Sequence, residues 1–129
     1  MSMMNPAAAY RNQQIMTASP EQLTLMLYDG AIRFLRASIT AIEAKDMEKA
    51  HDMNMRTQEI VREFRQTLNM DIELSENWDK LYEFMEYRLM EGNVKKDKAM
   101  LQDVLDLLRD MRDTWAEAMK LAKGITPEK

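Results

Sequence analysis

The sequence predicts an all-α fold, an antiparallel up-down four-helix bundle with a short mobile N-terminal arm. Along four long segments apolar residues recur at helical spacing, and nowhere do β-branched residues alternate with polar ones over a useful length. Glycine and proline are scarce, with three residues of each, and most lie at expected helix ends or in the tails. The connections between the four segments are short, which forces neighbouring helices to run antiparallel.

The first helix is expected at about residues 20–44 and is more apolar than a bundle helix needs to be. Ser19 can cap it, Pro20 suits the first helical position and Gln22 completes a capping box. A corner helix needs apolar residues at roughly three positions in seven. Here they form two adjacent tracks, one with Leu27, Ala31, Phe34 and Ala41, the other with Tyr28, Ile32, Leu35, Ile39 and Ile42. We expect something beyond the neighbouring helices to cover this surplus, although a deeply buried position would also explain it.

Turn and capping residues predict the other three helices. Lys45 and Asp46 should form a tight turn, with Asp46 as the N-cap of the second helix. A connector at about residues 69–74 precedes the third helix, which begins at Ser75 or a neighbour, and Asp97 should cap the fourth. The expected ranges are about 47–68, 75–91 and 97–122.

Two of the three glycines mark expected helix ends. Gly92 and Gly124 lie where the third and fourth helices should close, because glycine readily adopts the left-handed conformation found after many helices. Gly30 lies inside the first helix instead, where glycine costs about 1 kcal/mol relative to alanine. We expect close approach of another backbone to offset this cost.

Length and composition restrict the class of protein. A chain of 129 residues supports one domain, here divided into an arm at 1–18, the bundle at 19–124 and a tail at 125–129. The net charge of −4 disfavours nucleic-acid binding, which depends on clustered lysine and arginine. No apolar run could span a membrane, and the first residues lack the pattern of a signal peptide. We therefore expect a cytoplasmic protein with neither nucleic-acid nor membrane partners.

The sequence lacks a set of residues for catalysis or metal binding. His51 is the only histidine, and the Glu48-x-x-His51 match to di-iron bundles lacks the second copy that such a site needs. There is no cysteine and no glycine-rich loop to cradle a phosphate. Asp29 and Arg33, one helical turn apart, are expected to form a surface ion pair. We expect no enzyme activity, no metal and no cofactor.

Methionine is unusually frequent, with 14 residues in the chain. Most of them can simply fill the core. Their flexible, polarizable side chains also adapt to varied apolar ligands and are over-used on promiscuous binding surfaces. A bundle with surplus apolar surface and no catalytic set is best explained as a binder of an amphipathic peptide.

Several sequence blocks resemble the flagellar secretion chaperone family, FliS. They are AY at residues 9–10, TASPEQL at 17–23 and MLYDGAIRFL at 26–35, followed by single matches as far as Trp115. The connector at 69–77 departs from the family, whose members often carry a glycine pair there. The resemblance implies a cytosolic export chaperone that binds the disordered C-terminal segment of flagellin. By sheltering that segment, such a chaperone prevents premature polymerisation and keeps flagellin competent for flagellar type III secretion.

The resemblance also implies where the client binds. In the family an N-terminal arm covers part of the groove until the client displaces it, and Tyr10 matches the arm tyrosine. With hydrophobicity added, the expected groove or groove-cover residues are Tyr10, Ile15, Met26, Tyr28, Ile32 and Leu35. Each of them has a rival assignment as plain core. The rival function is a structural helical-bundle protein that self-associates through the same face. A monomeric or weakly dimeric state, and direct contact with a component of the flagellar export gate, are left open.

Overall fold

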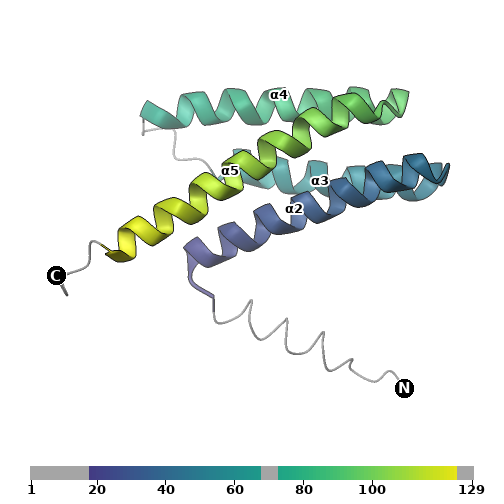
Figure 1. Ribbon diagram of the computed structural model, residues 1–129. Helices are drawn as coiled ribbons and strands as arrows, with labels where there is room; N and C mark the ends of the chain where they lie inside the picture. Colours follow the sequence, from purple (N-terminus) through teal and green to yellow (C-terminus); the bar gives the residue numbers. More distant parts are fainter. Residues whose placement is uncertain (1–17, 68–72, 125–129) are drawn as a thin grey trace, which may run out of the picture.

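The computed structural model describes residues 18–67 and 73–124 (Figure 1). Within these ranges the chain forms four helices and no strand: α2 (Pro20–Glu43), α3 (Met47–Gln66), α4 (Glu73–Lys95) and α5 (Lys98–Gly124). α2 packs against α3 and α5, and α4 packs against the same two helices. The predicted four-helix bundle is confirmed, whereas nearly all of the predicted arm lies outside the described residues.

The predicted N-terminal caps are formed. Ser19 Oγ accepts a hydrogen bond from the backbone N of Gln22 at 3.2 Å, and the Gln22 side chain accepts one from the Ser19 N at 3.0 Å. These two bonds satisfy donors that have no partner inside the helix. Asp46 caps α3 and Asp97 caps α5 in the same way, by accepting hydrogen bonds from backbone N–H groups of the first turn.

Two of the helices end at a lysine in the left-handed conformation. Lys45 follows α2 with φ of 64°, and Lys96 follows α4 with φ of 51°. The prediction that Gly92 closes the third helix is wrong, because α4 continues to Lys95 and Lys96 takes the left-handed position. Gly92 serves packing instead, since a Cβ there would lie only 2.7 Å from Leu101 Cδ2.

A stack of aromatic rings forms one part of the core. The ring of Tyr28 stacks on Phe64 with 4.4 Å between centroids, and Phe64 stacks on Tyr82 at 5.6 Å. The two tyrosine hydroxyls are 2.8 Å apart, so they hydrogen bond to each other in the interior. Burial raises the pKa of both Tyr28 and Tyr82. Side chains with no exposed surface complete the core: Ala31, Leu35, Ala50, Val61, Met85, Leu89, Leu101, Val104 and Leu108.

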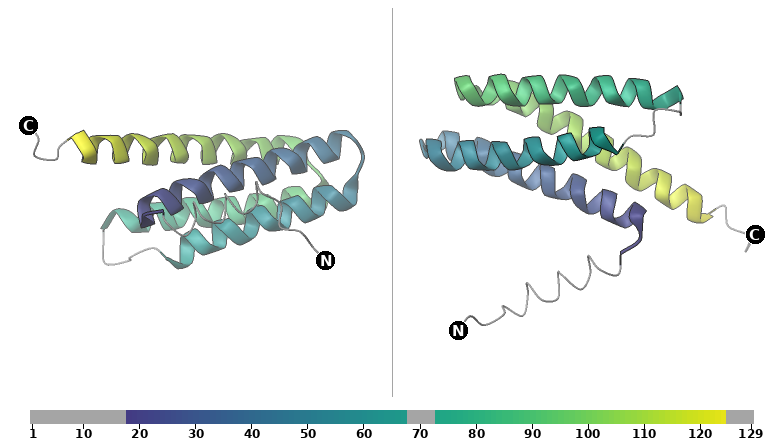
Figure 2. Two further views of the ribbon diagram at one scale, coloured as in Figure 1. Left: turned by 90° about the horizontal axis from the view of Figure 1, so that it is seen from below. Right: turned by 180° about the vertical axis from the view of Figure 1, so that it is seen from behind.

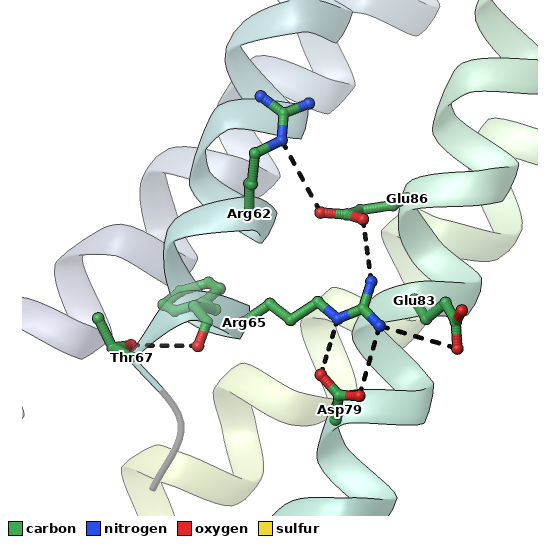
Figure 3. A network of polar contacts seen from close by, with 7 residues as sticks. Arg62, Arg65, Thr67, Asp79, Glu83 and Glu86 are labelled. Atoms are coloured by element: carbon green, nitrogen blue, oxygen red, sulfur yellow. Dashed lines mark hydrogen bonds and ion pairs between the residues drawn. The ribbon is translucent and has the colours of Figure 1, made fainter. Parts of the chain in front are cut away.

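Polar contacts tie α3 to α4. Asn54, which interrupts the apolar stripe of α3, is fully buried, and its Nδ2 donates to the carbonyl oxygen of Leu89 at 3.2 Å. Nearer the end of α3, Arg65 Nε lies 2.7 Å from Asp79 Oδ1, and Arg65 Nη1 lies 3.3 Å from Glu86 Oε1 (Figure 3). The hydrogen bond to Asp79 raises the pKa of Arg65, whose charge is shared among several α4 carboxylates.

The C-terminal half of α5 leans away from α4 and passes over the first turns of α2 (Figures 1 and 2). Trp115 Nε1 fixes this crossing by donating to the carbonyl oxygen of Glu21 at 3.0 Å. Beyond that contact, Ala118 and Ala122 continue the apolar seam of the helix but are exposed. α3 packs along another side of α2.

Candidate binding groove

A groove of about 410 Å³ lies between α2 and α3. One wall is a face of α2 on which apolar residues and a glycine recur at helical spacing, and the other is formed by Ile60 of α3. Leu27 on this face has 37 % of its surface exposed. The complete lining is Leu23, Met26, Leu27, Asp29, Gly30, Arg33, Phe34 and Ile60.

Gly30 keeps the groove hollow. Gly30 is buried, yet a Cβ added to it would make only ordinary contacts, 3.7 Å from Ile60 Cδ1 and 3.9 Å from Arg33 Nη2. Among the described residues, no backbone atom of another helix comes within 4 Å of that position. The predicted approach of another backbone to Gly30 is therefore not made by any of the helices that the structure describes. The space that a side chain would fill is part of the groove.

Phe34 lies beside two arginines. The guanidinium carbon Cζ of Arg33 is 5.7 Å from the centre of the Phe34 ring, and that of Arg56 is 5.5 Å from it. Both distances are within the range of a cation–π interaction. The apolar groove thus carries positive charge at the position of Phe34.

The predicted ion pair between Asp29 and Arg33 is not formed. Asp29 Oδ1 instead accepts a hydrogen bond from Arg112 Nε of α5 at 2.8 Å. The hydrogen bond and the charge of Asp29 raise the pKa of Arg112. This contact joins α2 to α5 and removes the carboxylate that the sequence assigned to Arg33.

The structure separates the six residues predicted for the binding site. Met26 lines the groove. Tyr28 and Leu35, with 1 % and 0 % of their surface exposed, lie in the core, which was their rival assignment. Ile32 is partly buried and packs against the same core. The two that lie outside the described residues are Tyr10 and Ile15.

Most of the lining of this groove is absent from the predicted set, because the prediction favoured the other apolar track of the first helix. Leu27 and Phe34 belong to one track, whereas Tyr28, Ile32 and Leu35 belong to the other. The available signal was Gly30, which lies three residues after Leu27 and four before Phe34. A glycine between two large apolar residues on one helix face leaves a gap between them.

The groove offers apolar surface and cations rather than a cluster of titratable groups. In residues 18–67 and 73–124, no group of three or more His, Asp or Glu side chains is arranged to hold a metal ion. His51 is exposed, and its Nδ1 lies 2.9 Å from Asn93 Nδ2. No helix in the described part of the chain is long and apolar enough to cross a bilayer. The lining of the groove suits apolar side chains, with Arg33 as a cation at its edge.

Comparison with known proteins agrees with this fold. Residues 3–122 match the family model described as flagellar protein FliS. A relative named flagellar secretion chaperone FliS, from Bacillus subtilis (strain 168), is 40 % identical over 120 residues, which cover 93 % of this chain and 90 % of the relative. The protein of the same name from Escherichia coli (strain K12) is 31 % identical over 108 residues, which cover 81 % of this chain and 79 % of that protein.

A solved structure described as a flagellar chaperone from bacteria has the same fold. It superposes with a TM-score of 0.73 at 18 % identity, covering 89 % of this chain and 98 % of the other. The family model spans nearly the whole chain, and the relatives match over most of their own length. The chain therefore belongs to the FliS family of flagellar proteins.

Proposed function

We propose that this protein is a cytoplasmic export chaperone that binds the disordered C-terminal segment of flagellin. Binding would prevent premature polymerisation and keep flagellin competent for flagellar type III secretion. The observation that carries the proposal is the open apolar groove on α2, the helix whose sequence has more apolar surface than its neighbours need. The relatives named flagellar secretion chaperones support the same class of function.

The lining of the groove suits an amphipathic segment. Such a segment places apolar anchors at helical spacing into a hydrophobic groove. Met26 is flexible and adapts to the shape of what it contacts, and Leu27 presents exposed apolar surface at the edge. A volume of about 410 Å³ accepts only a few side chains. Ordering a disordered client costs several kcal/mol, so flagellin must also contact surface beyond this groove.

We propose that the arm at residues 1–18 covers the groove when no client is bound. α2 begins directly after Ser19, and Leu23 at the start of α2 already lines the groove. An arm that leaves the bundle at this point needs little chain to reach the groove with Tyr10 and Ile15. Competition between arm and client would keep the apolar lining out of water.

Self-association is the alternative function, although the surface that favours it is the outward face of α4 and not the face of the first helix that the sequence suggested. Four apolar side chains on that face are largely exposed, and Val94 has 84 % of its surface accessible. The others are Phe84, Tyr87 and Met90. A second copy of the chain could bury this face.

Calorimetry with the C-terminal segment of flagellin tests the proposal. Leu27→Glu places a charge in the groove, whereas Val94→Glu places the same charge on the exposed face of α4. Burying an unpaired charge is costly, so Leu27→Glu should weaken binding by about tenfold or more. Val94→Glu should bind like the wild type. Circular dichroism must show that both variants keep their helices.

A version that lacks residues 1–18 tests the role of the arm. It should bind the flagellin segment more tightly than the full chain, because the arm no longer competes for the groove and all of the protein is competent to bind. A wild-type protein that elutes as a stable oligomer and ignores the flagellin segment would instead support self-association. In that case Val94→Glu should convert the oligomer to a monomer.

A further inference from the structure

We propose that Arg33 and Arg56 form a carboxylate-binding site at the groove, so that the bound segment must carry an acidic side chain beside its apolar anchors. This inference rests on the proposed function and adds a requirement on the charge of the client. Apolar anchors alone allow a helical segment to slide by a turn or to bind in either direction. A fixed charge contact selects one register.

One cation lines the groove and a second lies beside it at the same aromatic ring. Arg33 belongs to α2 and Arg56 to α3, and their Cζ atoms lie 5.7 Å and 5.5 Å from the centre of the Phe34 ring. Phe34 and Arg33 both line the groove. The positive charges are therefore concentrated at one apolar side chain that the client would contact.

Gly30 provides the space in which the guanidinium of Arg33 lies. The Arg33 Nη2 atom is 3.9 Å from the position that a Cβ on Gly30 would occupy. Because Gly30 is one turn before Arg33, the arginine side chain extends back along α2 over the floor of the groove. It stays exposed to solvent there, so an incoming carboxylate can reach it.

The acidic side chains of the described residues do not neutralise this pair. No carboxylate among them lies within 4.0 Å of Arg33 or Arg56, and Asp29 is engaged by Arg112 at 2.8 Å. Ion pairs are formed elsewhere on the same helices, for example at Arg65. Two like charges at one ring repel each other, and a carboxylate accepting forked hydrogen bonds from guanidinium groups would offset that repulsion.

The overall charge of the chain sharpens the contrast. The protein has a net charge of −4, so its overall charge does not attract an acidic segment. An arginine pair at the apolar groove makes this location the favoured one for such a segment. Charge complementarity of this kind fixes register and discriminates between partners more than it adds affinity.

The test is a double-mutant cycle between the arginines and the carboxylates of the flagellin segment. The protein variants are Arg33→Gln, Arg56→Gln and the double variant. The peptide variants replace each Asp by Asn and each Glu by Gln in turn. Arg36→Gln is the matched control, because Arg36 is an exposed arginine of α2 that does not line the groove.

The double variant should bind the unmodified peptide about five- to tenfold more weakly at low salt. The loss should shrink at high salt, because exposed charges are screened. One peptide position should be coupled, so that its neutralisation weakens binding to the wild type but hardly changes binding to the double variant. Arg36→Gln should bind within about twofold of the wild type.

The inference is overturned if each peptide change weakens binding to the double variant by the same factor as it weakens binding to the wild type, so that no position is coupled to the arginines. If the glutamine variants fold poorly, Arg33→Lys and Arg56→Lys keep the charge and must keep the coupled position. Suppose that the wild type binds the segment, that Leu27→Glu prevents binding and that the arginine changes have no effect. In that case only this inference fails. If the wild type does not bind the segment at all, the proposed function fails as well.

Discussion

The same substitution at two helical glycines should have opposite effects on stability. Gly30→Ala should stabilise the protein, because glycine in a helix interior costs about 1 kcal/mol relative to alanine. The added Cβ would lie 3.7 Å from Ile60 Cδ1 and 3.9 Å from Arg33 Nη2, which are ordinary contact distances. No neighbour has to move, so the free energy of unfolding should rise by about 1 kcal/mol.

Gly92→Ala should destabilise the protein. The added Cβ would lie 2.7 Å from Leu101 Cδ2 and 3.1 Å from Leu101 Cγ. Leu101 has no exposed surface, so its side chain cannot swing into solvent to make room. Overpacking of this kind costs about 1–3 kcal/mol, and the middle of that range exceeds the gain in helix propensity of about 1 kcal/mol. The expected net loss in free energy of unfolding is about 1 kcal/mol.

Urea unfolding followed by far-UV circular dichroism measures both changes. The two variants should lie on opposite sides of the wild type, about 2 kcal/mol apart, with unchanged m-values. Gly30→Ala should also bind the flagellin segment more weakly, because its methyl group occupies the floor of the groove. A Gly30→Ala protein that is less stable than the wild type would show that this floor is closed, and the proposed binding site would lose its physical basis.

Three further predictions concern the core and one helix end. Tyr28→Phe and Tyr82→Phe each leave one buried hydroxyl unpaired and should lower the free energy of unfolding by about 1–3 kcal/mol, whereas the double phenylalanine variant should recover most of the loss in urea titrations. Burial raises the pKa of both hydroxyls above the ordinary value of 10.0, so above pH 10 the unfolded chain releases protons that the native state retains. Stability should therefore fall as pH rises beyond that value, by at most about 1.4 kcal/mol per pH unit for each tyrosine, and less steeply in the double variant. Lys45→Gly should relieve the left-handed conformation at φ of 64°. It should stabilise the protein by up to about 1 kcal/mol, whereas Lys80→Gly at an exposed position inside α4 should destabilise it by a similar amount.

The local features of the fold could be predicted from the sequence because they depend on neighbouring residues. The capping box of Ser19 and Gln22 and the caps at Asp46 and Asp97 are each set within a single turn, and all are formed. Gly92 was assigned wrongly for the opposite reason. Its role depends on Leu101, which approaches only after α4 and α5 pack together.

The ion pairs show the same division between local and distant contacts. The sequence places Arg33 one turn from Asp29, and such a pair on an exposed helix contributes only about 0.3–0.5 kcal/mol. Arg112 lies 83 positions away in the chain but reaches Asp29 with a hydrogen bond of 2.8 Å. A weak local preference is easily replaced by a tertiary contact, and helical spacing alone cannot reveal such a contact.

The candidate groove was the hardest feature to predict, because periodicity shows how much of α2 is apolar but not which neighbour covers each track. Tyr28 and Leu35 were selected by size and hydrophobicity, and these properties also make them good core residues. Leu27 and Phe34 have the same properties but lie on the flank where α3 leaves the groove open. Only the relative positions of the helices distinguish the two tracks.

Glycine is unfavourable inside a helix, yet Gly30 lies inside α2. Packing among the described helices does not require a glycine at this position. Departures of this kind tend to mark functional positions, because a sequence otherwise agrees with its fold at every level. Gly92 is the instructive contrast, since its close contact with Leu101 leaves no room for a methyl group. At Gly30 a methyl group would fit, and alanine would make the helix more stable by about 1 kcal/mol. What glycine preserves there is the open floor of the groove and the room for Arg33, which are the two features that a bound segment would use.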